Sequence, residues 1–316
     1  QERPDINMVR TILQQLFQAV AHVHEQKLMH GDLKLLNVVR FQLDGRLRLI
    51  DFDAGAPFST DEKEEYAGAK FSSAILPPEM FHELKDEQEE QTFKAYWLPH
   101  ESQADEALWS KVAPRKARGR GSFVVKSFRT DDDGLPIHMP IHDGKCIPYD
   151  LVEASASIDI WSLGTIAFML AVGEPLVSST RDDDCASGDA MRVLHDWGLK
   201  ADAVHRHLQS VTDPAARDLV SKLLKRDPND RPTVSTALKH IFFRSASLDR
   251  AADDSVVAEL RQIRAAQDEE LRQIRAAQEE QTEKLKAIDE RTRLLAKLSY
   301  EQRSELKRTR EVLLKG

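Results

Sequence analysis

Apolar residues near the start of the chain recur at intervals of three, four and seven positions, the spacing of one helix face. They are Ile12, Leu13, Leu16, Phe17, Val20, Ala21, Val23 and His24. This period is typical of an amphipathic α-helix packed against a core. We expect the helix to end near Lys27, where an extended run at 28–32 begins.

Two short segments follow in which apolar and polar positions alternate, residues 37–43 and 46–52. Asp44 and Gly45 lie between them, and an Asp-Gly pair is a strong signal for a tight turn. The pattern therefore predicts a β-hairpin. Its two ends would bring residues 30–32 close to residues 51–53.

A further run, residues 161–173, is almost entirely apolar. It is too short to span a bilayer and contains two glycines, so we interpret it as a buried core helix. Residues 81–150 are polar and irregular and contain Pro and Gly; we call this stretch the insertion. The expected fold of residues 1–244 is mainly α with a small β-hairpin, interrupted by the insertion.

The C-terminal part of the chain carries an internal repeat. Residues 259–269 and 270–280 are identical at ten of eleven positions, and a period of eleven fits a long helix with a narrow apolar stripe. We expect a linker at 245–255 and a coiled-coil helix over 256–316, because self-association would bury that stripe. A lone charged helix, or one folded back on residues 1–244, is the alternative.

Composition narrows the class of protein. The 316 residues include 45 Lys and Arg against 53 Asp and Glu, a net charge of −8, so the chain is a poor general nucleic-acid binder. Cys146 and Cys185 make neither a disulfide framework nor a Cys-x-x-Cys metal pair. We therefore expect a cytoplasmic setting, with a nuclear one as the alternative, and neither a nucleic-acid nor a membrane partner.

Residues suited to phosphoryl transfer gather at the two ends of the predicted hairpin, in HGDLKLLN at 30–37 and IDFD at 50–53. Asp32 can orient or deprotonate a hydroxyl group, and Lys34 can neutralise a transferring phosphoryl group. Asn37 and Asp51 offer the oxygen ligands that Mg²⁺ prefers. Phosphoryl transfer depends mainly on positioning and electrostatics, so these are the groups it needs.

The two motifs resemble the catalytic loop and the metal-binding Asp-Phe-Gly motif of the protein kinase superfamily. Four other segments are similar to that family in order and approximate spacing. LPPEM at 76–80 resembles the Ala-Pro-Glu motif that closes the family's activation segment, and LLKRDPNDRPT at 223–233 resembles the stretch whose Arg pairs with the Glu of that motif. DIWSLG at 159–164 resembles part of the family's central helix, and ALKHIFF at 237–243 resembles the helix that ends the domain.

The resemblance implies the C-terminal lobe of a Ser/Thr protein kinase over residues 1–244, with ATP and Mg²⁺ as cofactors and a protein Ser or Thr hydroxyl as substrate. It implies that Asp32 is the catalytic base or a hydroxyl-orienting group, that Lys34 contacts the γ-phosphate, and that Asn37 and Asp51 hold Mg²⁺. The structural residues it implies are His30 in the catalytic loop, Asp159 bonded to the backbone of that loop, and an ion pair between Glu79 and Arg231.

Three departures from the family pattern bear on activity. Gly31 stands where the family usually has an Arg that receives an activation-loop phosphate. Asp53 replaces a Gly that can adopt positive φ. No Gly-rich loop or strand Lys of a nucleotide-binding lobe can be assigned, and the chain opens without Met, which hints at a fragment with little activity alone. The alternative is a pseudokinase scaffold that forms a homo-oligomer through residues 256–316.

Three patterns in the insertion have competing interpretations. Residues 119–126 (GRGSFVVK) resemble a Gly-rich loop with a following Lys, but the third Gly is missing, and a strand is the better interpretation. The basic run 114–120 fits either a nuclear signal, a peptide-docking site or a solvated loop. His138 and His142 have helical spacing, but Pro140 forbids a regular helix between them, which argues against a metal site.

Self-association is testable directly. If residues 256–316 form a coiled coil, light scattering should report a homo-oligomer. A strict monomer at high protein concentration would contradict the coiled-coil prediction.

Overall fold

The computed structural model describes residues 4–42, 44–58, 65–97, 103–130 and 147–244. The linker at 245–255, the coiled coil at 256–316, and His138 with His142 lie outside the described residues, so these predictions remain predictions.

Helix α1 spans Ile6–Glu25 and confirms the first predicted element. The Asp5 carboxylate caps its first turn by accepting the backbone N–H of Asn7 at 2.8 Å. Leu13, Leu16, Phe17 and Val20 are buried on the predicted face. The helix ends just before Lys27, whose backbone is left-handed with φ of 60°.

Helix α4 spans Ala156–Val172 and confirms the predicted core helix, since every side chain from Ile158 to Phe168 is buried. A Cβ at Gly164 would lie 2.7 Å from a methyl carbon of Leu224, so glycine there permits close packing against the end of helix α7 (Pro214–Leu223). Gly173 ends α4 in the left-handed conformation. No helix in the described part of the chain is long and apolar enough to cross a membrane.

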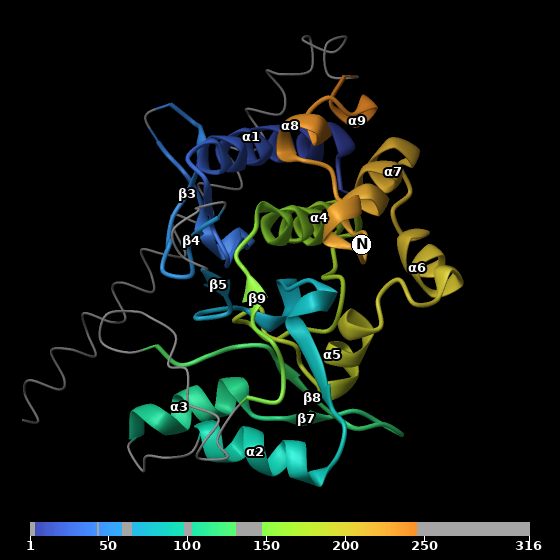
Figure 1. Ribbon diagram of the computed structural model, residues 1–316. Helices are drawn as coiled ribbons and strands as arrows, with labels where there is room; N and C mark the ends of the chain where they lie inside the picture. Colours follow the sequence, from blue (N-terminus) through green and yellow to red (C-terminus); the bar gives the residue numbers. More distant parts are fainter. Residues whose placement is uncertain (1–3, 43, 59–64, 98–102, 131–146, 245–316) are drawn as a thin grey trace, which may run out of the picture. The chain divides into compact units, whose positions relative to one another are not determined.

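Among the shorter helices, α8 and α9 pack against α1 and α7 packs against α4, whereas α5 lies on the side of the insertion (Figure 1). The Arg10 side chain of α1 donates from Nε to the backbone oxygen of Phe242 at 2.6 Å, which ties the two ends of this region together. The helix bounds are α5 Gly188–His195, α6 Ala201–Leu208, α7 Pro214–Leu223, α8 Val234–Ala237 and α9 Ile241–Arg244. The short 3-10 turns are η1 Leu35–Asn37, η2 Ser73–Ile75, η3 Pro78–Met80 and η5 Pro228–Asp230.

The predicted hairpin is present, with shorter strands than expected. Strand β2 pairs antiparallel with β3, and the turn between them closes through a hydrogen bond from Phe41 N to Arg46 O of 2.9 Å. Two other antiparallel pairs are β1 with β4 and β5 with β9. The bounds are β1 Leu28–Met29, β2 Val38–Arg40, β3 Leu47–Leu49, β4 Ala56–Pro57, β5 Tyr66–Ala67 and β9 Val152–Glu153.

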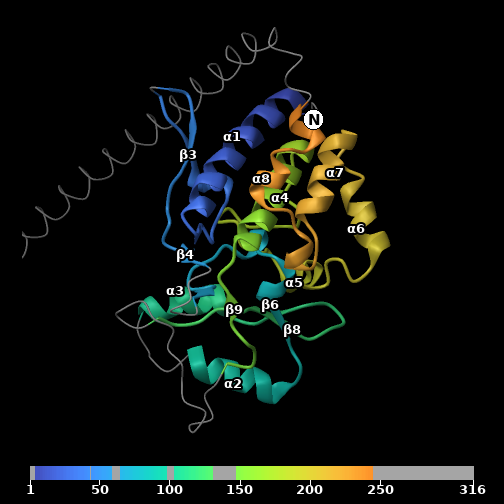
Figure 2. The ribbon, with the colours of Figure 1, turned by 45° about the horizontal axis from the view of Figure 1, so that its top comes forward.

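The insertion is folded wherever the structure describes it, and this corrects the expectation of an irregular stretch. Its sheet has the strand order β6-β8-β7, and two helices lie beside it, away from α1, α8 and α9 (Figures 1 and 2). Phe93 and Phe123 are fully buried. The bounds are β6 Phe81–Leu84, α2 Glu87–Trp97, α3 Gln103–Val112, β7 Arg115–Lys116 and β8 Ser122–Val125.

Two of the competing interpretations in the insertion are decided. Residues 122–125 form strand β8, which confirms the strand interpretation of 119–126. The basic run is partly a strand and partly a solvated turn: residues 115–116 form β7, and residues 118–120 are exposed. In this turn Arg118, whose side chain is 94% exposed, pairs with Asp189 at 3.2 Å, and Arg120 pairs with Asp196 at 2.5 Å.

A buried aromatic core inside the insertion has a measurable consequence. Phe123→Ala should lower the free energy of unfolding by about 3–5 kcal/mol, because it removes a fully buried ring. Phe41→Ala, at a ring that is 42% exposed, is the matched control and should cost far less. Urea unfolding of both variants measures the difference, and equal effects would contradict a stabilising role of the buried Phe123 ring.

Candidate functional site

Asp32 lies between β1 and η1 with its two carboxylate oxygens in different environments. Oδ2 is 2.9 Å from Nζ of Lys34. The Asn37 side chain donates from Nδ2 to the backbone oxygen of Asp32 at 2.9 Å, which fixes the loop. Oδ1 is buried and has no hydrogen-bond partner among the described residues. This oxygen can therefore accept a hydrogen bond from a group that enters the site.

Lys34 connects this loop to the segment that precedes Glu79. Its Nζ donates to the hydroxyl oxygen of Ser72 at 2.7 Å, and Ser72 is buried. Asp183 approaches from the loop after α4: burial raises the pKa of its carboxyl group, and the nearby Lys34 cation opposes that rise. The sequence analysis missed Ser72, and only its place seven residues before Glu79 could have suggested it.

Asn37 and Asp51 lie at the two ends of the predicted hairpin. The backbone N–H of Ile50 donates to the backbone oxygen of Asn37 at 3.0 Å, so Asp51 follows directly after this contact. Asp51 is exposed and has a left-handed backbone with φ of 65°, which Asp tolerates better than most residues. In the described part of the chain, no hydrogen bond occupies the Asp51 carboxylate or the side-chain oxygen of Asn37.

Oxygen donors of this kind suit Mg²⁺. No group of three or more His, Cys, Asp or Glu side chains among the described residues could hold a metal ion. Mg²⁺, however, is usually held by only one or two protein ligands together with substrate phosphates and water. One carboxylate and one amide oxygen, from Asp51 and Asn37, therefore fit Mg²⁺ better than they fit Zn²⁺, which takes mainly sulfur and nitrogen ligands.

The two departures in the motifs have different structural consequences. The family's Gly at position 53 can adopt positive φ, but Asp53 does not have positive φ in this structure. Positive φ occurs at Asp51 instead, so Asp53 causes no backbone strain of that kind. The Asp53 carboxylate instead pairs with the ammonium group of Lys70. Gly31 has φ of +78°, and a Cβ there would lie 2.2 Å from the backbone oxygen of Ala54. Any side chain at position 31, including Arg, would collide with that backbone.

Asp159 is hydrogen-bonded to the backbone of the catalytic-loop motif. Its fully buried carboxylate accepts the backbone N–H of His30 at 2.8 Å and that of Gly31 at 3.0 Å. It is also 2.8 Å from Nε2 of His24 in α1, a contact that the sequence analysis missed because His24 continues an apolar helix face. The buried His30 ring bonds to the backbone oxygen of Ile50 at 3.1 Å and so joins the two motifs.

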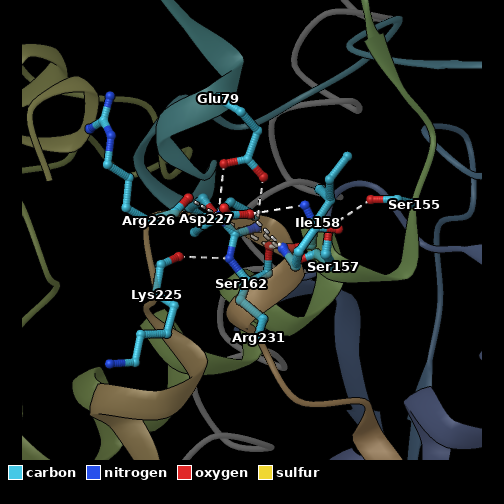
Figure 3. A network of polar contacts seen from close by, with 11 residues as sticks. Glu79, Ser155, Ser157, Ile158, Ser162, Lys225, Arg226, Asp227 and Arg231 are labelled. Carbon is cyan, nitrogen blue, oxygen red and sulfur yellow. Dashed lines mark hydrogen bonds and ion pairs between the residues drawn. The ribbon is translucent and has the colours of Figure 1, made fainter. Parts of the chain in front are cut away.

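Glu79 and Arg231 form a bidentate ion pair with distances of 2.6 and 2.7 Å (Figure 3). The Arg231 side chain is fully buried and donates also to the backbone oxygens of Ser157, Lys225 and Arg226. All five N–H donors of the guanidinium group are thereby used. This is a buried, hydrogen-bonded pair and not a surface pair of little energetic weight.

Comparison with known proteins places this arrangement in a family. The family described as "Protein kinase domain" matches residues 3–97 and 150–243, which is more than half of the chain. The unmatched stretch, 98–149, lies inside the insertion, and the match includes residues 81–97.

Individual relatives are similar at low identity. A probable serine/threonine-protein kinase mps1 of Dictyostelium discoideum is 23% identical over 244 residues, 76% of this chain and 18% of the relative. Calcium-dependent protein kinase 2 of Zea mays is 31% identical over 34% of this chain and 20% of its own length. Calcium/calmodulin-dependent protein kinase cmkA of Emericella nidulans is 34% identical over 33% of this chain and 23% of its own length. The chain thus matches about a fifth of the length of these relatives.

Because the Glu79–Arg231 pair is buried, neutralising Glu79 should destabilise the protein far more than neutralising the carboxylate of an exposed ion pair. Glu79→Gln should lower the free energy of unfolding by about 3–5 kcal/mol, since it leaves a buried guanidinium group without a counter-charge. Asp44→Asn removes the carboxylate of the exposed Asp44–Arg48 pair and is the matched control, for which no measurable change is expected. Urea unfolding followed by tryptophan fluorescence tests both, and a Glu79→Gln variant as stable as the control would contradict the prediction.

Proposed function

Since the chain belongs to the protein kinase family, we propose that it supplies the catalytic and metal-binding residues of a Ser/Thr protein kinase. The observation that carries this proposal is that the two carboxylate oxygens of Asp32 have different surroundings. One oxygen is paired with Lys34, while the other is buried and without a partner among the described residues. An acceptor held in this way is suited to receive the proton of a substrate hydroxyl.

The residues around Asp32 fit the same reaction. Lys34 is a cation beside the acceptor and can offset negative charge on a transferring phosphoryl group. Asn37 fixes the Asp32 backbone through its amide nitrogen, and its side-chain oxygen, with the Asp51 carboxylate, would hold Mg²⁺. MgATP, when bound, supplies the γ-phosphoryl group and a metal ion that neutralises phosphate charge. Protein Ser or Thr hydroxyls are the proposed substrates.

A pseudokinase scaffold is the second candidate, and Gly31 favours it. The close approach of Gly31 to Ala54 excludes the phosphate-receiving Arg that the family usually has. Asp53, which pairs with Lys70, does not separate the two candidates, because its backbone is unstrained. In the scaffold version, residues 256–316 set the oligomeric state and no turnover is needed.

Phosphotransfer from MgATP to a Ser/Thr peptide mixture distinguishes the two candidates. In the protein that carries this chain, Asp32→Asn should lower turnover by about 10²–10⁴-fold, because Asn cannot accept the hydroxyl proton. Asp44→Asn on the exposed hairpin turn is the control and should leave turnover unchanged. Residues 1–316 alone should show little turnover, since no Gly-rich loop or strand Lys is assigned in them. Equal turnover by wild type and Asp32→Asn would favour the scaffold.

A further inference from the structure

Residues 65–80, the described part of the activation segment before β6, run beside the insertion and the strand that follows it. Strand β5 pairs with β9, so that Tyr66 lies opposite Glu153. The backbone N–H of Ala154 donates to Glu65 O at 2.7 Å, and that of Lys126 donates to Met80 O at 2.7 Å. Backbone hydrogen bonds therefore fix this segment at both ends.

Between these two ends, Gly68 brings the segment into direct backbone contact with the insertion. Gly68 has φ of +107°, and a Cβ at this position would lie 2.5 Å from the backbone oxygen of Lys126. No residue other than glycine fits without a shift of one backbone or the other. This approach is specific for the insertion, because the Lys126 carbonyl directly follows strand β8.

Side chains reinforce the same contact. The Tyr66 ring meets the Phe128 ring of the insertion edge-on, with centroids 6.5 Å apart. The ammonium group of Lys111 in α3 lies 5.2 Å from the centre of the buried Phe71 ring. The insertion thus touches the segment at Tyr66, Gly68 and Phe71, and again at its end at Met80.

Segments of this kind are commonly ordered by a phosphate that pairs with Arg side chains. The catalytic loop here has Gly31 in a place where no side chain fits. The exposed Asp53–Lys70 pair also joins this loop region to the segment, but an exposed pair contributes little. Lys34, Asp184, Ser162 and Arg231 bond to residues 72–79 of this segment. The stretch before them, residues 66–71, is contacted by the insertion.

We propose that the insertion is a built-in clamp that orders residues 65–80 of the activation segment without phosphorylation. The Gly68 approach, the Tyr66–Phe128 contact and the Lys126–Met80 hydrogen bond are its contact points. The inference rests on the proposed function only where it calls the ordered segment productive for catalysis. The clamp itself is a matter of local order, which can be measured without turnover.

Amide hydrogen exchange followed by mass spectrometry tests the clamp. Gly68→Ala should speed exchange across residues 65–80 by about tenfold or more, while α1 and α4 keep their protection. Gly119→Ala is the matched control: Gly119 also has positive φ, +67°, but a Cβ there meets nothing within 4 Å. It should leave residues 65–80 protected. Unchanged exchange in Gly68→Ala would overturn the proposal, as would an equal loss of protection in α1 and α4.

Two further measurements keep the test decisive. Phe128→Leu, which weakens the contact with Tyr66, should loosen residues 65–80 in the same way if Gly68→Ala fails to fold. Phosphatase treatment of the wild-type protein should not change exchange in this segment. If dephosphorylation loosens residues 65–80 as much as Gly68→Ala does, the segment depends on phosphate and the clamp is refuted. Loss of phosphotransfer alone, with the exchange pattern as expected, would count against the proposed function and not against the clamp.

Discussion

A fully buried guanidinium group organises much of the structure. Moving a charge away from water is costly unless a counter-charge and hydrogen bonds replace the lost solvation. Arg231 meets this requirement with the Glu79 carboxylate and three backbone oxygens from two other parts of the chain. The end of the activation segment, the start of α4 and the loop after α7 are therefore held at one point, because each supplies part of the solvation of one cation.

The start of α4 transmits this constraint to the site. Ser157, which accepts from Arg231, lies two residues before Asp159, whose carboxylate holds the backbone of His30 and Gly31. The loop that carries Asp32 is thus positioned by a rigid, buried helix and not by its own hydrogen bonds alone. Residues that never touch substrate thereby support the geometry at Asp32.

The sequence was informative where local pattern and local chemistry agree. The Asp44–Gly45 turn located the hairpin, and the hairpin explained why the segment around His30 lies beside Ile50 and Phe52. Contacts between distant parts of the chain could not be predicted from local pattern. The Lys34–Ser72 and His24–Asp159 contacts depend on tertiary packing. The insertion was misjudged because its core aromatics, such as Phe93 and Phe123, are scattered among charged residues and show no clear period. Asp53 replaces a Gly that can adopt positive φ, but the structure has positive φ at Asp51 and not at Asp53.

Pairing of β5 with β9 also imposes an order of events on synthesis. Tyr66 and Glu153 are adjacent in the folded protein but far apart along the chain. At roughly 5–20 residues per second, Glu153 is made on the order of ten seconds after Tyr66. During that interval β5 has no β9 to pair with. The pairing of β5 with β9 can therefore form only after the whole insertion has been synthesised.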